Sequence, residues 1–306
     1  MSFNDNASLD TSRMGGGGGG GRGPVIAGGG GIVGLIVAVV YFLFTGNLPG
    51  GDGGQSQAPA EQGQQQGQGS GYEECRSGAD ANESRTCLMV GGENSLYDYW
   101  SNQPDLKQGL GDREFPNPTV NIYSGQTQSQ CGTASNQVGP FYCPLDQGIY
   151  IDTDFFDIME RQLGAEDGPL AELYVLAHEY GHHIQNLYGV LEESQKDPKG
   201  ANSGAVRVEL MADCFAGMWV QDAATTKDKN GNTLLEQPTE EQIRNALGAA
   251  KSVGDDTIQK RSGGGVNPDG WTHGSAQARQ GWFIKGMQAE NINQCDTFEV
   301  DNPENV

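Results

Sequence analysis

The stretch LAHEYGHHIQ, residues 176 to 185, constrains this chain more than any other, because it holds three of the four histidines. Within it, H-E-Y-G-H places His178 and His182 four residues apart, and residues with that spacing lie on one face of a helix. Two imidazoles one turn apart can bind one metal ion, while Glu179 between them stays free to take a proton from water. The motif therefore predicts a metal site on a helix.

A second carboxylate pair follows in the segment ELMAD, residues 209 to 213. A catalytic zinc needs a third protein ligand and an open position for water. We expect Glu209 to be that ligand, and Asp213 to accept the N–H of a ligand histidine and fix its tautomer. The alternative is a solvated helix edge, which the many apolar neighbours disfavour. Two imidazoles and a carboxylate suit Zn²⁺, although another divalent ion stays open.

The remaining polar candidates have weaker patterns. His183 lies off the ligand face, and we expect it to be hydrogen-bonded without a metal role. His273 stands in a loop before a predicted helix, where it either stabilises the oxyanion formed when water attacks a carbonyl or only buttresses that helix. Tyr188 is the rival for the oxyanion. Arg279 is expected in a salt bridge, with a clamp for a substrate carboxylate as the alternative.

The pattern of apolar residues predicts an α+β fold, namely a mainly helical domain with a small sheet. Strands are predicted at 119–123 and 148–152, where β-branched and aromatic residues stand between turn formers. We expect the second of these, GIYID, to be an edge strand that pairs with an extended substrate. Helices are predicted over 155–163, 169–188, 206–223, 239–253 and 276–288, the fourth opened by a capping box.

An uncharged stretch of twenty residues, 25–44, is about as long as one bilayer of helix and predicts a single transmembrane helix. Arginines precede it and none follows closely, which puts the N-terminus in the cytoplasm. The expected order is a disordered cytoplasmic tail (1–24), the membrane helix (25–44), a Gly/Gln-rich linker (45–71) and an extracytoplasmic domain (72–306), anchored in the cell membrane. A cleaved signal peptide is the alternative.

Charge and cysteines restrict the partners and the compartment. The net charge of −22 repels phosphate backbones, so we expect no nucleic-acid partner. The six cysteines form no C-x-x-C motif and allow fifteen pairings, of which we expect Cys75–Cys87, Cys131–Cys143 and Cys214–Cys295. Six free thiols are the alternative, which an extracytoplasmic location disfavours.

Four blocks, PFYCPLDQGIYID, AHEYGHHIQN, VELMADCFAGMW and THGSAQARQGWF, resemble in this order those of a bacterial family of membrane-anchored neutral zinc metallopeptidases. The opening FNDNASLDTSR is also similar to the family's N-termini, although a glycine run replaces the basic residues many members carry. The resemblance covers about residues 120 to 298. It implies a zincin-like domain, with His178, His182 and Glu209 as zinc ligands and Glu179 as the base, similar to the thermolysin-like zincins.

The leading hypothesis is a membrane-anchored zinc metallopeptidase that hydrolyses peptide or protein substrates with Glu179 as general base. The alternative from another class is a non-catalytic, tethered envelope protein that keeps zinc for stability. An intact Glu179 argues against it, because a structural site needs no base and closes its fourth position. Zinc amidohydrolysis of cell-wall peptides is a third possibility. The natural substrate and the oligomeric state stay open.

Overall fold

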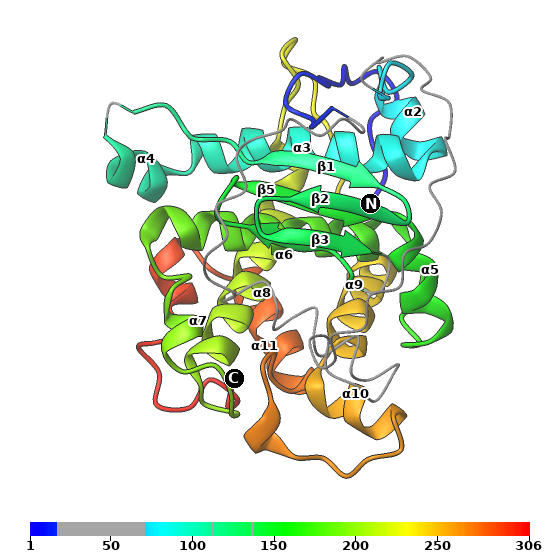
Figure 1. Ribbon diagram of the computed structural model, residues 1–306. Coiled ribbons are helices and arrows are strands. Elements are labelled where there is room, and N and C mark those ends of the chain that lie inside the picture. Colours follow the sequence, from blue (N-terminus) through cyan, green and yellow to red (C-terminus); the bar gives the residue numbers. More distant parts are fainter. Residues whose placement is uncertain (17–70, 112, 136–137) are drawn as a thin grey trace.

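The computed structural model describes residues 1–16, 71–111, 113–135 and 138–306. About half of these residues are helical, and the strands form two small sheets (Figure 1). The helices are α2 (Gly78–Glu83), α3 (Arg85–Asn102), α4 (Pro104–Leu110), α5 (Asp154–Arg161), α6 (Pro169–Tyr188), α7 (Glu193–Lys196), α8 (Gly204–Asp222), α9 (Glu240–Ser252), α10 (Asp255–Arg261) and α11 (Ala276–Gly286). The strands are β1 (Thr119–Tyr123), β2 (Gln126–Ser129), β3 (Gly132–Ser135), β4 (Phe141–Cys143) and β5 (Gly148–Asp152).

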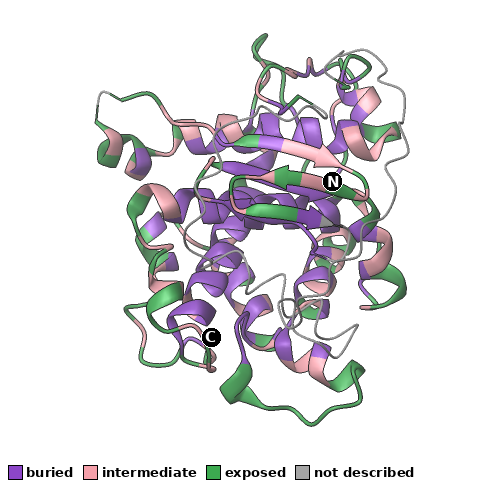
Figure 2. Cartoon of the chain, viewed as in Figure 1, coloured by how far each residue is buried: buried purple, intermediate pink, exposed green. Residues whose placement is uncertain are grey.

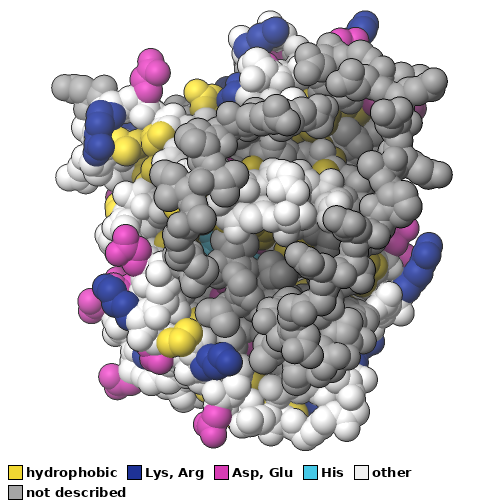
Figure 3. All heavy atoms as spheres, in the orientation of Figure 1, with side chains coloured by type: hydrophobic (Ala, Val, Ile, Leu, Met, Phe, Trp, Pro, Cys, Tyr) yellow, Lys and Arg dark blue, Asp and Glu magenta, His cyan; other side chains and the backbone are white. Residues whose placement is uncertain are grey.

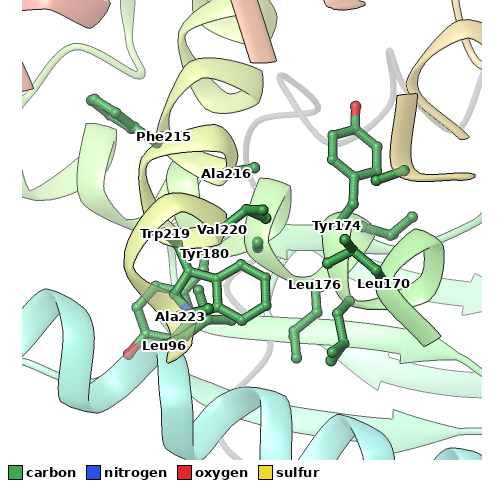
Figure 4. Packing of buried hydrophobic residues seen from close by; sticks show 14 of the residues in the cluster. Leu96, Leu170, Tyr174, Leu176, Tyr180, Phe215, Ala216, Trp219, Val220 and Ala223 are labelled. Atoms are coloured by element: carbon green, nitrogen blue, oxygen red, sulfur yellow. The ribbon is translucent and has the colours of Figure 1, made fainter. Parts of the chain in front are cut away.

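Helix α6 forms the centre of the core. It begins with Pro169, whose fixed φ suits the first helical turn, and it ends at Gly189, which adopts a left-handed φ of 71°. Every residue from Leu170 to Gln185 is buried, because α3, α8 and α9 and the strands β4 and β5 surround the helix (Figure 2). Figure 4 shows part of this packing, where Tyr180 of α6 and Trp219 of α8 lie near Leu96 of α3.

Helices α8 and α11 approach each other closely because glycines face each other at their crossing. A Cβ on Gly217 of α8 would lie 2.1 Å from the carbonyl oxygen of Phe283, and one on Gly286 of α11 would lie 1.9 Å from that of Cys214. No side chain fits at either position, since such distances are far inside van der Waals contact. The two glycines therefore set the spacing that brings the side chains of α11 to those of α8.

The larger sheet has the strand order β1-β5-β4, with β1 parallel and β4 antiparallel to β5. Both predicted strands occur with the expected bounds. The expectation that GIYID is an edge strand is wrong, because β5 has a neighbour on each side. The reason is β4, a buried strand of three residues that is too short to give a periodic signal.

The pattern of apolar residues did not predict several of the helices, of which α3 is the longest. Helix α3 has eighteen residues, yet its buried set includes Glu93, Asn94 and Ser95 alongside apolar side chains. Because partners surround this helix on most sides, its apolar residues do not form one stripe, and the period of an amphipathic helix is absent. By contrast, the capping box of Thr239 and Gln242 opens α9 as predicted.

All six cysteines are paired, and the three predicted disulfides, Cys75–Cys87, Cys131–Cys143 and Cys214–Cys295, are confirmed. The first two close short loops, while the third connects α8 to the segment after α11 across 81 residues. This last bond holds together the two parts of the chain that cross at Gly217 and Gly286.

The predicted fold class needs correction. The domain is about half helical rather than mainly so, and the single transmembrane helix is not supported. The segment 25–44 itself lies outside the described residues; within those that are described, no helix is long and apolar enough to cross a membrane. Residues 1–16, expected in a cytoplasmic tail, pack into the same core as the helices, with Phe3, Ala7 and Leu9 buried.

Candidate metal centre

Three side chains predicted as metal ligands converge between α6 and α8. The ligand atoms of His178, His182 and Glu209 all lie within 4.8 Å of one another, and all three residues are buried. The Nε2 atom of His178 is 3.1 Å from Glu209 Oε2, and Nε2 of His182 is 3.4 Å from Glu209 Oε1. Metal–ligand bonds of about 2.0–2.1 Å in a tetrahedron give ligand separations of roughly 3.3 Å, so these spacings suit zinc.

The second nitrogen of each imidazole has its own partner. Nδ1 of His178 lies 2.9 Å from Asp213 Oδ1, as predicted for Asp213. Nδ1 of His182 lies 2.8 Å from Gln185 Oε1, and Gln185 in turn donates to the carbonyl of Val208 at 2.6 Å. With a metal bound, each ring would donate through Nδ1 and use the lone pair of Nε2 as the ligand. Sequence reasoning missed Gln185, although it lies only three residues after His182.

A buried nitrogen atom without a hydrogen-bond partner among the described residues shows whether these residues fit a metal. Nε2 of His182 is buried and has no hydrogen-bond partner within the part of the chain that the structure describes. A buried polar atom without a partner costs free energy, so such atoms are rare in folded proteins. A zinc ion bound to His178, His182 and Glu209 would satisfy it, and the donor set of two imidazoles and a carboxylate matches catalytic zinc sites.

Behind the ligands stands a buried ion pair that sequence spacing does not reveal. Arg279 of α11 donates from Nε to Asp213 Oδ2 at 2.8 Å and from Nη2 to Oδ1 at 3.0 Å. Tyr174, one turn before His178 on α6, donates to Asp213 Oδ1 at 2.5 Å. The predicted salt bridge of Arg279 is therefore confirmed, with Asp213 as its partner. Asp213 thereby holds α6, α8 and α11 together at the site.

The charges of this network shift the ionisation of the metal-free site. Burial alone would lower the pKa of His178, but Asp213 and Glu209 outweigh it and raise that pKa to about 10. Burial alone would raise the pKa of the Glu209 carboxyl group. The neighbouring His182 and His178 outweigh burial and hold that pKa well below its usual range. Without metal, the site is therefore an imidazolium between two carboxylates.

Glu179 lies beside the ligands without joining them. Its carboxyl group is buried, and Oε2 has no hydrogen-bond partner in the described ranges. Burial raises its pKa, while the neighbouring His182 and His178 counteract this in part. The carboxyl group is thus desolvated and has an oxygen free to accept a proton.

His273 comes to the same region from the loop before α11. It is buried, and its pKa is raised because Asp255 and Glu209 together outweigh the burial that would lower it. Asp255 Oδ2 accepts the backbone N–H groups of Thr272, His273 and Gly274 at 2.7 to 3.0 Å, and Oδ1 lies 3.3 Å from Nδ1 of His273. Asp255 precedes His273 by eighteen residues and had no local sequence signal. All four histidines are buried, and Figure 3 shows a small area of histidine side chain on one face of the molecule.

The structure does not bring the other two candidates to the ligands. His183 is fully buried, where Nε2 donates to the carbonyl of Pro116 at 2.6 Å and Nδ1 lies 3.1 Å from Tyr142 Oη. Burial lowers its pKa to about 4, so it is neutral, as its hydrogen-bonding role predicts. Tyr188 ends α6, is 43% exposed and lies against Gly109 of α4. At 1.5 Å per residue it is about 15 Å along the helix from His178.

Comparison with known proteins gives one family. A family model described as "Putative neutral zinc metallopeptidase" matches residues 3–298. An uncharacterized protein of Mycobacterium tuberculosis, Rv2575, is 47% identical over 228 residues, which cover 74% of this chain and 75% of that protein. The uncharacterized protein YpfJ of Escherichia coli is 40% identical over 208 residues, 66% of this chain and 67% of its own length. No solved structure matches.

Proposed function

Because this chain belongs to the neutral zinc metallopeptidase family, whose cofactor is zinc, we propose that it hydrolyses peptide bonds in peptide or protein substrates. The observation that carries this proposal is the position of Glu179. Its buried carboxyl group adjoins the cluster of His178, His182 and Glu209, and among the described residues its Oε2 has no hydrogen-bond partner. A zinc site kept only for stability needs no such group, and burying it without a partner has a cost.

The ligands and the base have separate tasks. His178, His182 and Glu209 would hold zinc, which when bound polarises a substrate carbonyl and acidifies water. Glu179 takes the proton from the attacking water and then delivers it to the leaving amine. Asp213 and Gln185 keep the two imidazoles in the tautomer that leaves Nε2 free.

His273 is the proposed partner of the oxyanion that forms on the substrate carbonyl. It is held in place by Asp255 at Nδ1, and Asp255 together with Glu209 raises its pKa against the effect of burial. A protonated imidazole there would donate from Nε2 to the developing negative charge. Tyr188 is not proposed for this role, because it lies at the far end of α6 against α4.

The test compares the full zinc-loaded chain with its Glu179→Gln variant on a broad peptide library that includes cell-wall stem peptides. We expect equal zinc content and a loss of at least roughly a hundredfold in turnover, the size of a general-base contribution. Equal turnover by both proteins, or no cleavage by either with zinc bound, would instead favour a structural zinc. A cleavage product from stem peptides alone would narrow the substrate to the cell wall.

The three disulfides support a second part of the proposal, that the domain folds in an oxidising compartment. Alkylation of the protein from its native host under non-reducing conditions should label no cysteine. Six labelled cysteines would contradict this location.

A further inference from the structure

The N-terminal segment, residues 1–16, is bound by side chains that recognise its backbone. Asn82 accepts from the N–H of Phe3 at 2.8 Å and donates to its carbonyl at 2.9 Å. Asn94 does the same for Asp10, at 2.7 and 2.8 Å. A side-chain amide that pairs with both backbone groups of one residue fixes the backbone of that residue in place. Two such pairs, seven residues apart, fix the segment along its length.

The surface of α2 and α3 beneath the segment is fitted closely to it. A Cβ on Gly91 of α3 would lie 2.5 Å from the ring of Phe3, and one on Gly78 of α2 would lie 1.9 Å from the carbonyl oxygen of Asn4. The bound side chains of Phe3 and Leu9 are buried. Figure 1 shows the segment, in dark blue, beside α2 and the loop 226–236, from which Asp228 accepts the N–H of Ser8 at 2.8 Å. The groove thus has the features of a receptor site for a peptide.

A charge pair anchors the end of the segment. Arg13 donates hydrogen bonds to the carboxylate of Glu93 on α3, from Nε at 2.8 Å and from Nη2 at 3.2 Å. The Glu93 side chain is fully buried. Glu93 also accepts from Asn117 at 3.1 Å, and Asn117 accepts from the hydroxyl of Tyr180 at 2.6 Å. Tyr180 stands on α6 between the two zinc-binding histidines. The chain of contacts therefore runs from Arg13 to the helix that carries the metal centre.

We infer that residues 1–16 are a separable peptide ligand, which the groove of α2, α3 and the loop 226–236 holds without needing the covalent connection, and that their binding positions α6. The occupant is the segment of the same chain. The inference does not rest on peptidase activity, because it concerns retention of a peptide and of zinc. Arg13 is a positioning residue, since it acts on the ligands through Glu93, Asn117 and Tyr180.

The experiment inserts a specific protease site between residues 55 and 66 of the full, zinc-loaded chain and cuts it after folding. Gel filtration and mass spectrometry should find both pieces in one peak of monomer size at micromolar concentration. A fluorescent peptide of residues 1–16, added in excess, should exchange slowly into the groove. Separation of the pieces on cutting, or a dimer that exchanges segments between copies, would overturn the inference.

Variants test the anchor. The substitution Arg13→Glu places a negative charge next to the buried, negatively charged Glu93. The cut chain should therefore lose its N-terminal segment at least tenfold faster than the wild type, and it should bind zinc more weakly. Ser12→Ala, at an exposed neighbouring position, is the matched control and should behave as the wild type. Equal retention by both variants would contradict the role of Arg13, and unchanged zinc affinity after loss of the segment would contradict the link to α6. If Arg13→Glu does not fold, the exchange of the labelled peptide into the cut wild-type protein decides the question.

Discussion

Nδ1 of His178 lies 2.9 Å from Oδ1 of Asp213, on the next helix of the core. Asp213 at the same time pairs with the guanidinium of Arg279 from a third helix. One carboxylate thus orients a metal ligand and neutralises a buried cation, which ties zinc binding to the packing of α6, α8 and α11.

Asp213→Asn should therefore change two properties together. Without the anionic oxygen, His178 loses its orientation and basicity, and zinc affinity should fall by roughly ten- to a hundredfold. The buried Arg279 loses its counter-charge, which should lower the free energy of unfolding by about 3 kcal/mol. Competition with a chelating dye and urea unfolding measure the two effects. Asp222→Asn, at the exposed end of α8, is the control, and an Asp213 variant that behaves like it would contradict this role.

Zinc binding should release protons. The pKa of His178 is raised to about 10 in the metal-free protein, so its imidazole is protonated at pH 7.5, whereas a ligand nitrogen must be unprotonated. Since zinc displaces that proton, apparent zinc affinity should rise as the pH rises toward 10. Calorimetric titration in buffers of different ionisation enthalpy should give about one proton released. Release of none would mean that the imidazole is already neutral.

Gly286→Ala should destabilise the fold, because its Cβ would lie 1.9 Å from the carbonyl oxygen of Cys214 and would push α11 away from α8. We expect a loss of about 3 kcal/mol in the free energy of unfolding. Gly248→Ala on α9 is the matched control, since its Cβ meets only ordinary contacts at 3.8 Å. That substitution should stabilise the protein by about 0.5 to 1 kcal/mol through helix propensity. Equal unfolding midpoints would refute the close crossing.

The disulfides should differ in what they contribute. The Cys214–Cys295 bond closes 81 residues and the Cys131–Cys143 bond only 12. Loop-closure entropy predicts contributions of about 4.5 and about 3 kcal/mol, respectively. Denaturant unfolding of the two double alanine variants checks this order. A larger loss from the short loop would show that local packing dominates over chain entropy.

Much of the metal centre could be predicted from the sequence, because its signals are local. The spacing of His178 and His182 fixes both on one face of a helix, and Glu209 with Asp213 forms a similar pair on α8. Pro169 and Gly189 mark the bounds of α6, as the short-range rules for helix ends predict. The disulfide partners follow from sequence order.

The tertiary structure alone decided which distant groups complete the site. Arg279 meets Asp213 across 66 residues, and Asp255 meets His273 across eighteen, so no periodic pattern connects them. The middle position of β5 depends on the short strand β4, and the packing of residues 1–16 depends on glycines and asparagines in α2 and α3. The sequence determined which residues carry the chemistry, because helix periodicity and capping act over a few residues. The partners of those residues were decided by which elements pack together, since the contacts between elements are long-range and leave no local pattern.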